Sequence, residues 1–192
     1  ALISVFPGSR KSEIEVLTPI LLQAIKILNE SNKDITYVFH STKEHSSAIQ
    51  THITKSELIN CEVISDDKIK SHILMKSIFA IAKSGTVSLE ICNLKIPSII
   101  LYKMNFINFL IVKMLVKTKF ANIINIAAKK EIIPELLQGE CNPKNISNKT
   151  INFLDNPDRM EEQIKETQLI LKSLKNTNSS AYQAGLSLNK FL

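Results

Sequence analysis

The sequence contains no tryptophan and little arginine, and both shortages bear on the ligands that it can bind. Aromatic residues make up 6% of the 192 residues, and Arg10 and Arg159 are the two arginines among 24 basic residues. Proteins that bind nucleic acid stack bases on aromatic rings and place arginines against phosphates. The formal net charge of +6 comes from lysines, in a chain rich in isoleucine and asparagine. We therefore do not expect nucleic acid as a partner.

Cysteine and histidine are also sparse, and their spacing predicts neither disulfides nor a metal site. Cys61, Cys92 and Cys141 form no CxxC pair, which is typical of reduced thiols in a cytoplasmic protein. The histidines at positions 40, 45, 52 and 72 form no HExxH motif, so we expect no metal and no cofactor. No secretory signal is recognisable. Because Ala1 begins on a predicted strand without a methionine, we expect the chain to be part of a longer protein.

Apolar runs alternate with amphipathic segments over the first hundred residues. We predict strands at residues 2–6, 35–40, 61–64, 78–82 and 98–101, with helices at 12–29, 42–55, 67–76 and 86–96. This alternation predicts an α/β fold with a doubly wound, mostly parallel sheet and helices on both faces. The length is that of one domain. We expect residues 1–155 to form it, and residues 156–192 to form C-terminal helices that pack on it or cross to a missing N-terminal half.

A Ser-Gly-Thr turn at residues 83–86 joins the buried strand 78–82 to a short helix. Gly85 permits a close approach of backbone to a ligand, and Thr86 is expected to cap the helix. Free N–H groups at this turn would face the carboxyl edge of the sheet, where α/β folds bind phosphates. Glu90, one helical turn further on, is expected to accept hydrogen bonds from sugar hydroxyls. Taken alone, such a turn is at least as common without a ligand.

A second turn of the same kind follows the first predicted strand, where Pro7 and Gly8 precede Ser9 and Arg10. Two such turns on one sheet form a cleft. A guanidinium group offers phosphate the bidentate geometry that an ammonium group cannot offer. Since arginine is scarce here, we predict that Arg10 contacts a phosphate.

The segment 102–120 is apolar and carries lysines at intervals. Nine of the eleven residues from 106 to 116 are apolar, but a membrane-spanning helix needs about 20. Two interpretations remain open: the segment docks on the surface of an anionic membrane, or it is a core helix packed on the sheet. The candidate membrane contacts are Lys103, Phe106, Phe109, Lys113 and Lys117.

Beyond this segment we predict a short strand at 122–125, a loop and helix at 129–138, and helices at 142–154, 156–175 and 182–191. On this prediction Asn125, Glu131 and Gln138 lie near the carboxyl edge of the sheet, beside the two turns. Surface solvation alone also explains each of them.

Together these motifs resemble the C-terminal half of the lipid-A-disaccharide synthase family. The resemblance covers nearly the whole chain in order, and it includes residues 6–10, 13–14, 84–86, 89–90, Tyr102, Lys113, 115–117, Asn125 and 131–138. It implies one Rossmann-like half of a two-domain GT-B glycosyltransferase, the half that holds the UDP-sugar donor. The family transfers 2,3-diacylglucosamine from UDP to 2,3-diacylglucosamine 1-phosphate (lipid X), with inversion and without a metal, to give lipid A disaccharide 1-phosphate.

The resemblance also assigns roles to residues. It implies that Gly8, Ser9 and Arg10 face the diphosphate, that Ser84, Gly85 and Thr86 form the opposite phosphate loop, and that Glu90 holds the ribose. It places Asn125, Glu131 and Gln138 near the uridine or the donor sugar. The catalytic base and the lipid-acceptor site would belong to the N-terminal half. The implied location is the inner face of the inner membrane of a Gram-negative bacterium, and a homodimer remains open.

Two alternatives stay open at this point. A UDP-N-acetylglucosamine 2-epimerase would bind UDP in a similar half, but it predicts clustered His or Glu residues at the sugar site and no basic apolar segment. The alternative from another class is a non-catalytic module that binds nucleotide or docks on a membrane, which the sequence does not exclude.

Overall fold

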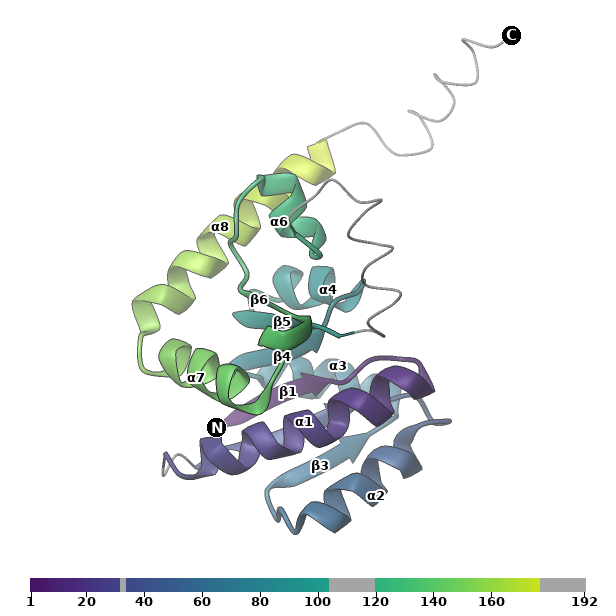
Figure 1. The fold of residues 1–192 in the computed structure, drawn as a ribbon. Coiled ribbons are helices and arrows are strands. Elements are labelled where there is room, and N and C mark those ends of the chain that lie inside the picture. Colours follow the sequence, from purple (N-terminus) through teal and green to yellow (C-terminus); the bar gives the residue numbers. More distant parts are fainter. Residues whose placement is uncertain (32–33, 104–119, 177–192) are drawn as a thin grey trace, which may run out of the picture.

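Within the described residues, the sheet of this protein has six parallel strands. The computed structural model describes residues 1–31, 34–103 and 120–176 (Figure 1). The strand order is β3-β2-β1-β4-β5-β6, and every neighbouring pair is parallel. The strands are β1 (Leu2–Phe6), β2 (Thr36–His40), β3 (Cys61–Ile64), β4 (Phe79–Lys83), β5 (Ser98–Tyr102) and β6 (Glu135–Leu137). The doubly wound α/β prediction is confirmed.

Helices cover both faces of the sheet. One face packs against α1 (Lys11–Asn29), α2 (Ser46–Ser56) and α7 (Pro143–Leu154). The other face packs against α3 (Asp67–Lys76), α4 (Val87–Asn93), α6 (Ile123–Ala128) and α8 (Pro157–Asn176). Figure 1 shows α1 in front of the sheet and α3 and α4 behind it. A 3-10 turn, η1 (Gln138–Glu140), links β6 to α7.

Alternate residues of each central strand enter the two cores, as the pleat of a strand requires. Ile3 and Val5 of β1 pack with α1, α2 and α7, whereas Ala80 and Ala82 of β4 pack on the opposite face. Strands buried on both faces read as continuous apolar runs. This is why the sequence alone located β1, β4 and β5.

The prediction for residues 122–138 was wrong in its order of elements. Residues 122–125 do not form a strand: the Asn122 side chain accepts a hydrogen bond from the Ile124 N–H at 2.8 Å and caps α6. The sixth strand is instead β6, within the segment predicted as a loop and helix, where it pairs with β5. Residues 42–45 are also a turn rather than the first turn of α2, which begins at Ser46.

Helix α8 is joined to the sheet by a buried glutamine. Gln163 is 5% exposed. Its side-chain oxygen accepts from the Ser98 N–H at 2.6 Å, and its amide donates to the carbonyls of Ser98 (3.0 Å) and Ile132 (3.3 Å). Gln168 donates to the Cys92 carbonyl at 2.6 Å. These bonds fix the start of β5 and the end of α4 against α8.

Several sequence predictions lie outside the described residues. They are Phe106, Phe109, Lys113 and Lys117 of the candidate membrane segment, and the helix predicted at 182–191. Within the part of the chain that the structure describes, no helix combines the length and apolar character needed to cross a bilayer.

Candidate functional site

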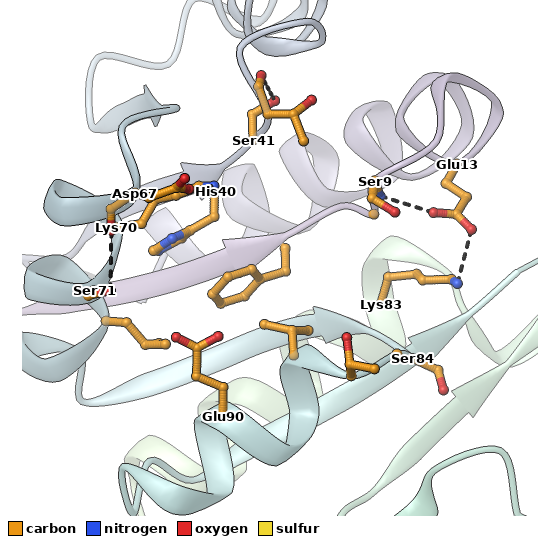
Figure 2. Close-up of a pocket in the computed structure, with 17 residues that line it drawn as sticks. Ser9, Glu13, His40, Ser41, Asp67, Lys70, Ser71, Lys83, Ser84 and Glu90 are labelled. Atoms are coloured by element: carbon orange, nitrogen blue, oxygen red, sulfur yellow. Dashed lines mark hydrogen bonds and ion pairs between the residues drawn. The ribbon is translucent and has the colours of Figure 1, made fainter.

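A cavity of about 460 Å³ opens at the carboxyl edge of the sheet, between β1 and β4. The chain winds outward from β1 through β2 to β3, then crosses to β4 and continues through β5 on the other side. This reversal leaves a crevice between the loops after β1 and β4, and open α/β sheets bind ligands in such crevices. The two predicted turns both line the cavity, through Gly8, Ser9, Ser84, Gly85 and Thr86. Figure 2 shows the side chains around it.

The turn after β1 is closed by a carboxylate of the protein itself. Glu13 Oε2 accepts hydrogen bonds from the backbone N–H groups of Ser9 (3.1 Å) and Arg10 (3.3 Å). Gly8 has φ +118°, and a Cβ there would lie 2.5 Å from Glu13 Oε2. Glycine is required at this position because the backbone is left-handed and because Glu13 approaches it closely. Glu13 therefore occupies the backbone N–H groups of Ser9 and Arg10 at this turn.

Two lysines supply the positive charge that lines the cavity. Lys83 Nζ lies 3.0 Å from Glu13 Oε1, so this ion pair joins the ends of β4 and α1 (Figure 2). Lys70 of α3 pairs with Asp67 at 2.8 Å. Burial raises the pKa of Glu13, but the hydrogen bonds from Lys83, Ser9 and Arg10 outweigh it and bring the pKa below its ordinary value of 4.5.

Arg10 does not line the cavity. It is the N-cap of α1, its side chain is 79% exposed, and its guanidinium lies 3.5 Å from Glu13 Oε1. Glu13, the third residue of α1, accepts the hydrogen bond from the Arg10 N–H and so closes the start of the helix. A single long contact leaves the guanidinium little restrained.

The turn after β4 is open toward the cavity. A Cβ on Gly85 would meet only the Lys83 carbonyl oxygen, at 4.0 Å, and the backbone there is not left-handed. The Ser84 hydroxyl donates to the Ala121 carbonyl at 3.0 Å. Thr86 occupies the N-cap position of α4 but makes no side-chain capping bond, so that expectation was wrong. Among the described residues, therefore, no contact requires glycine at position 85.

Glu90 points into the cavity from α4, as Figure 2 shows. Its side chain forms no hydrogen bond or ion pair with any residue in the ranges 1–31, 34–103 and 120–176. It is exposed, so its carboxylate is available to a ligand. The spacing from Gly85 placed it correctly, because one turn of helix carries residue 90 back over the loop.

The three residues predicted near the uridine or the donor sugar do not line the cavity: Asn125, Glu131 and Gln138. Asn125 is fully buried, and its amide binds the backbone of Ile132 and Ile133 and the carboxylate of Glu135. Glu131 precedes β6, so in a parallel sheet it lies on the amino-terminal side of that strand. The misplaced strand at 122–125 explains the placement of Asn125 and Glu131, whereas Gln138 directly follows β6 and lies at the carboxyl edge, as predicted, but away from the cavity.

Lys103, the one candidate membrane contact that the structure describes, donates from Nζ to the Cys141 carbonyl at 3.1 Å.

Burial raises the pKa of the thiols, to about 12 for Cys61 and Cys92 and about 11 for Cys141. All three cysteines are free, as predicted, and all three are buried. Protonated buried thiols are poor nucleophiles and poor metal ligands. Among the described residues no three His, Cys, Asp or Glu side chains gather as a metal site would need.

The cavity is also lined by residues to which the sequence analysis assigned no role, namely His40, Ser41, Thr42, Asp67, Lys70 and Ser71. They come from the end of β2 and from α3, neither of which carries a glycine turn. Their place at the cavity follows from the strand order, which sets β2 beside β1.

Solved structures place this architecture in a known class. The C-terminal domain of a group 1 glycosyl transferase family protein (LpcC) from Francisella tularensis matches with a TM-score of 0.61 and 12% identity, over 92% of this chain and 87% of that one. A UDP-GlcNAc 2-epimerase from Neisseria meningitidis, bound to UDP-GlcNAc, matches with a TM-score of 0.59 and 12% identity, over 92% and 44%. The fold is thus one Rossmann-like half of the GT-B type.

Sequence comparison identifies the family within that class. The family model described as lipid-A-disaccharide synthetase matches residues 1–187. Curated proteins called lipid-A-disaccharide synthase are 32% identical in Sulfurihydrogenibium sp. (strain YO3AOP1), over 90% of this chain and 47% of the relative, and 36% identical in Rickettsia bellii (strain OSU 85-389), over 87% and 43%. The chain belongs to the lipid-A-disaccharide synthetase family, and it spans less than half the length of these relatives.

Proposed function

We propose that this chain is the donor-binding half of a lipid-A-disaccharide synthase and that its cavity binds the UDP of UDP-2,3-diacylglucosamine. The observation that carries the proposal is the cavity at the switch point between β1 and β4, lined by both glycine turns and by Glu90. Glu90 accepts hydrogen bonds from the ribose hydroxyls. The acceptor site and the catalytic base lie outside this chain.

The diphosphate lies at the two turns, beside Ser9, Gly85 and Lys83. Among the described residues, the charged side chains that line the cavity are three carboxylates, Glu13, Asp67 and Glu90, and two ammonium groups, Lys70 and Lys83. A diphosphate needs further positive charge there. Arg10 supplies it, because its guanidinium stands next to Ser9 and only a 3.5 Å contact has to break before it turns inward.

Isothermal titration with UDP tests the proposal. Glu90→Ala should weaken UDP binding about tenfold or more, because a charge-assisted hydrogen bond contributes about 1.5–3 kcal/mol. Arg10→Ala should have an effect of similar size. Glu62→Ala is a matched control, since Glu62 is an exposed carboxylate on β3 away from the cavity. Equal affinity for UDP in the native chain and in both site variants would show that UDP does not bind at this cavity.

A second part of the proposal concerns location. Both substrates of this family carry acyl chains, so we propose that the enzyme works at the inner face of the inner membrane. Lysines of the 102–120 segment each contribute about 1 kcal/mol beside anionic lipid. Replacing Lys113 and Lys117 together by Glu should release the protein from vesicles that contain phosphatidylglycerol. Retention of the charge-reversed protein on these vesicles would contradict a role for this segment.

A further inference from the structure

His40 is a buried histidine that lines the cavity and has no role in the function proposed above. It is the last residue of β2 and is 4% exposed. Its ring stacks on Phe6, with centroids 4.2 Å apart and planes at 22°. The ring is therefore held in one place at the edge where the nucleotide is proposed to bind.

A chain of three hydrogen bonds decides which ring nitrogen carries the proton. Nε2 of His40 lies 2.8 Å from the Ser4 hydroxyl, which lies 2.7 Å from the Ser77 hydroxyl. Ser77 donates to the Ile73 carbonyl at 3.0 Å. A carbonyl oxygen only accepts, so Ser77 uses its single hydrogen there. Ser4 then donates to Ser77, and the proton between Ser4 and His40 comes from Nε2. The network leaves Nδ1 unprotonated.

The other nitrogen, Nδ1, has no partner in the part of the chain that the structure describes. Among the described residues, the fully enclosed polar side-chain atoms that lack a partner are Thr18 Oγ1, Tyr37 Oη and Asn122 Nδ2. Nδ1 of His40 is not one of them. Burial, with a smaller contribution from the charge of Lys70, lowers the pKa of His40 to about 3. The ring is neutral in the physiological range, and Nδ1 offers the cavity a hydrogen-bond acceptor.

A hydrogen-bond acceptor at this position favours ligand groups that can donate a hydrogen bond to it. Phosphate oxygens carry no hydrogen to donate, so the diphosphate gains nothing from Nδ1. A nucleoside does carry donors, at N3–H of a uracil base and at the ribose hydroxyls. A buried polar group that meets a matching donor discriminates against ligands that lack it, because the unmatched pair loses its hydrogen bond.

We propose that Nδ1 of His40 is a specificity contact, which accepts a hydrogen bond from a donor on the nucleoside part of the ligand. The contact rests on the proposed function, since it presumes that UDP occupies the cavity. The ligand group that pairs with Nδ1 is an N–H or O–H donor, which is either the N3–H of the base or a ribose hydroxyl.

The test is a double cycle of ligand and protein changes, measured by titration calorimetry. The ligands are UDP, N3-methyl-UDP, 2′-deoxy-UDP and 3′-deoxy-UDP, and the proteins are the native chain, His40→Phe and, as control, His72→Phe, whose histidine is exposed. The native chain and the control should lose about 3- to 10-fold in affinity when the paired donor is removed. In His40→Phe the same removal should have no effect, which identifies the donor.

A second measurement needs no substitution. Nitrogen NMR of the native chain should show the His40 ring protonated at Nε2 and unprotonated at Nδ1, and UDP should shift the Nδ1 resonance. A proton on Nδ1 would overturn the inference. So would UDP binding in which every ligand ratio is the same in His40→Phe and in the native chain. Failure of UDP to bind the native chain at all would instead overturn the proposed function, and this contact with it.

Discussion

Replacing Gly8 by alanine tests the physical account of the turn after β1. The backbone there has φ +118°, and the added Cβ would lie 2.5 Å from Oε2 and 2.7 Å from Cβ of Glu13. A non-glycine residue in such a conformation costs about 1–3 kcal/mol. Moving Glu13 aside also removes its bonds to Ser9, Arg10 and Lys83, of which one charge-assisted bond is worth about 1.5–3 kcal/mol.

The expected loss of unfolding free energy in Gly8→Ala is therefore about 2.5–6 kcal/mol. Urea unfolding followed by circular dichroism measures it. The midpoint should fall while the slope with urea stays unchanged, because the surface exposed on unfolding is the same. The variant should also bind UDP more weakly, since its turn no longer holds Ser9 in place.

Gly85→Ala is the matched control. Its Cβ would meet only the Lys83 carbonyl at 4.0 Å, and its backbone is not left-handed. We expect stability to stay within about 0.5 kcal/mol of the native chain, while the methyl group enters the cavity and weakens UDP binding. The reasoning fails if Gly8→Ala is as stable as the native chain, or if Gly85→Ala is destabilised as strongly as Gly8→Ala.

Three further outcomes follow from the contacts described. Gln163→Leu should lower the unfolding free energy by about 2–4 kcal/mol in urea, because the Ser98 N–H and carbonyl lose their partner; an unchanged midpoint would contradict the role of this bridge. The Glu13 carboxyl has a lowered pKa in the folded chain, so its stabilising contribution is present above pH 4.5 and is lost as the pH falls through the folded value. The difference in stability between the native chain and Glu13→Gln should therefore be largest near pH 7 and shrink below pH 4.5, and a difference that grows in acid would refute it. Finally, this chain alone should form no disaccharide above blank from UDP-2,3-diacylglucosamine and 2,3-diacylglucosamine 1-phosphate, whereas turnover would place the catalytic base within it.

The two glycine turns and Glu90 could be found from the sequence because their signals are local. An apolar strand, a glycine and a helix start within a few residues of one another, and the spacing fixes where Glu90 lies. Asn125 was misplaced for the opposite reason. Its buried amide is satisfied by Ile132, Ile133 and Glu135, which are distant along the helix and loop, so no local pattern revealed it.

The sixth strand shows the same limit. Residues 135–137 are only three, and their strand forms because β5 offers an unpaired edge to them. Residues 122–125 contain two β-branched isoleucines and so look more strand-like, yet the carboxylate of Glu135 accepts hydrogen bonds from the backbone N–H groups of Ala121 (2.6 Å) and Asn122 (3.0 Å) at the start of α6. A tertiary contact thus overrides the local preference.

The sequence by itself determined the class of fold, the two turns and the carboxylate of Glu90 through periodicity and spacing, and it indicated the family through its resemblance to known members. Only the tertiary structure decided which groups face the cavity. The strand order brings His40 and Lys70 beside Gly85, although 45 and 15 positions separate them along the chain. Glu13 takes the backbone N–H groups at the first turn, and a chain of hydroxyls fixes the proton of His40. These hydrogen bonds depend on which groups become neighbours in the folded chain. The linear pattern of residues does not contain that information.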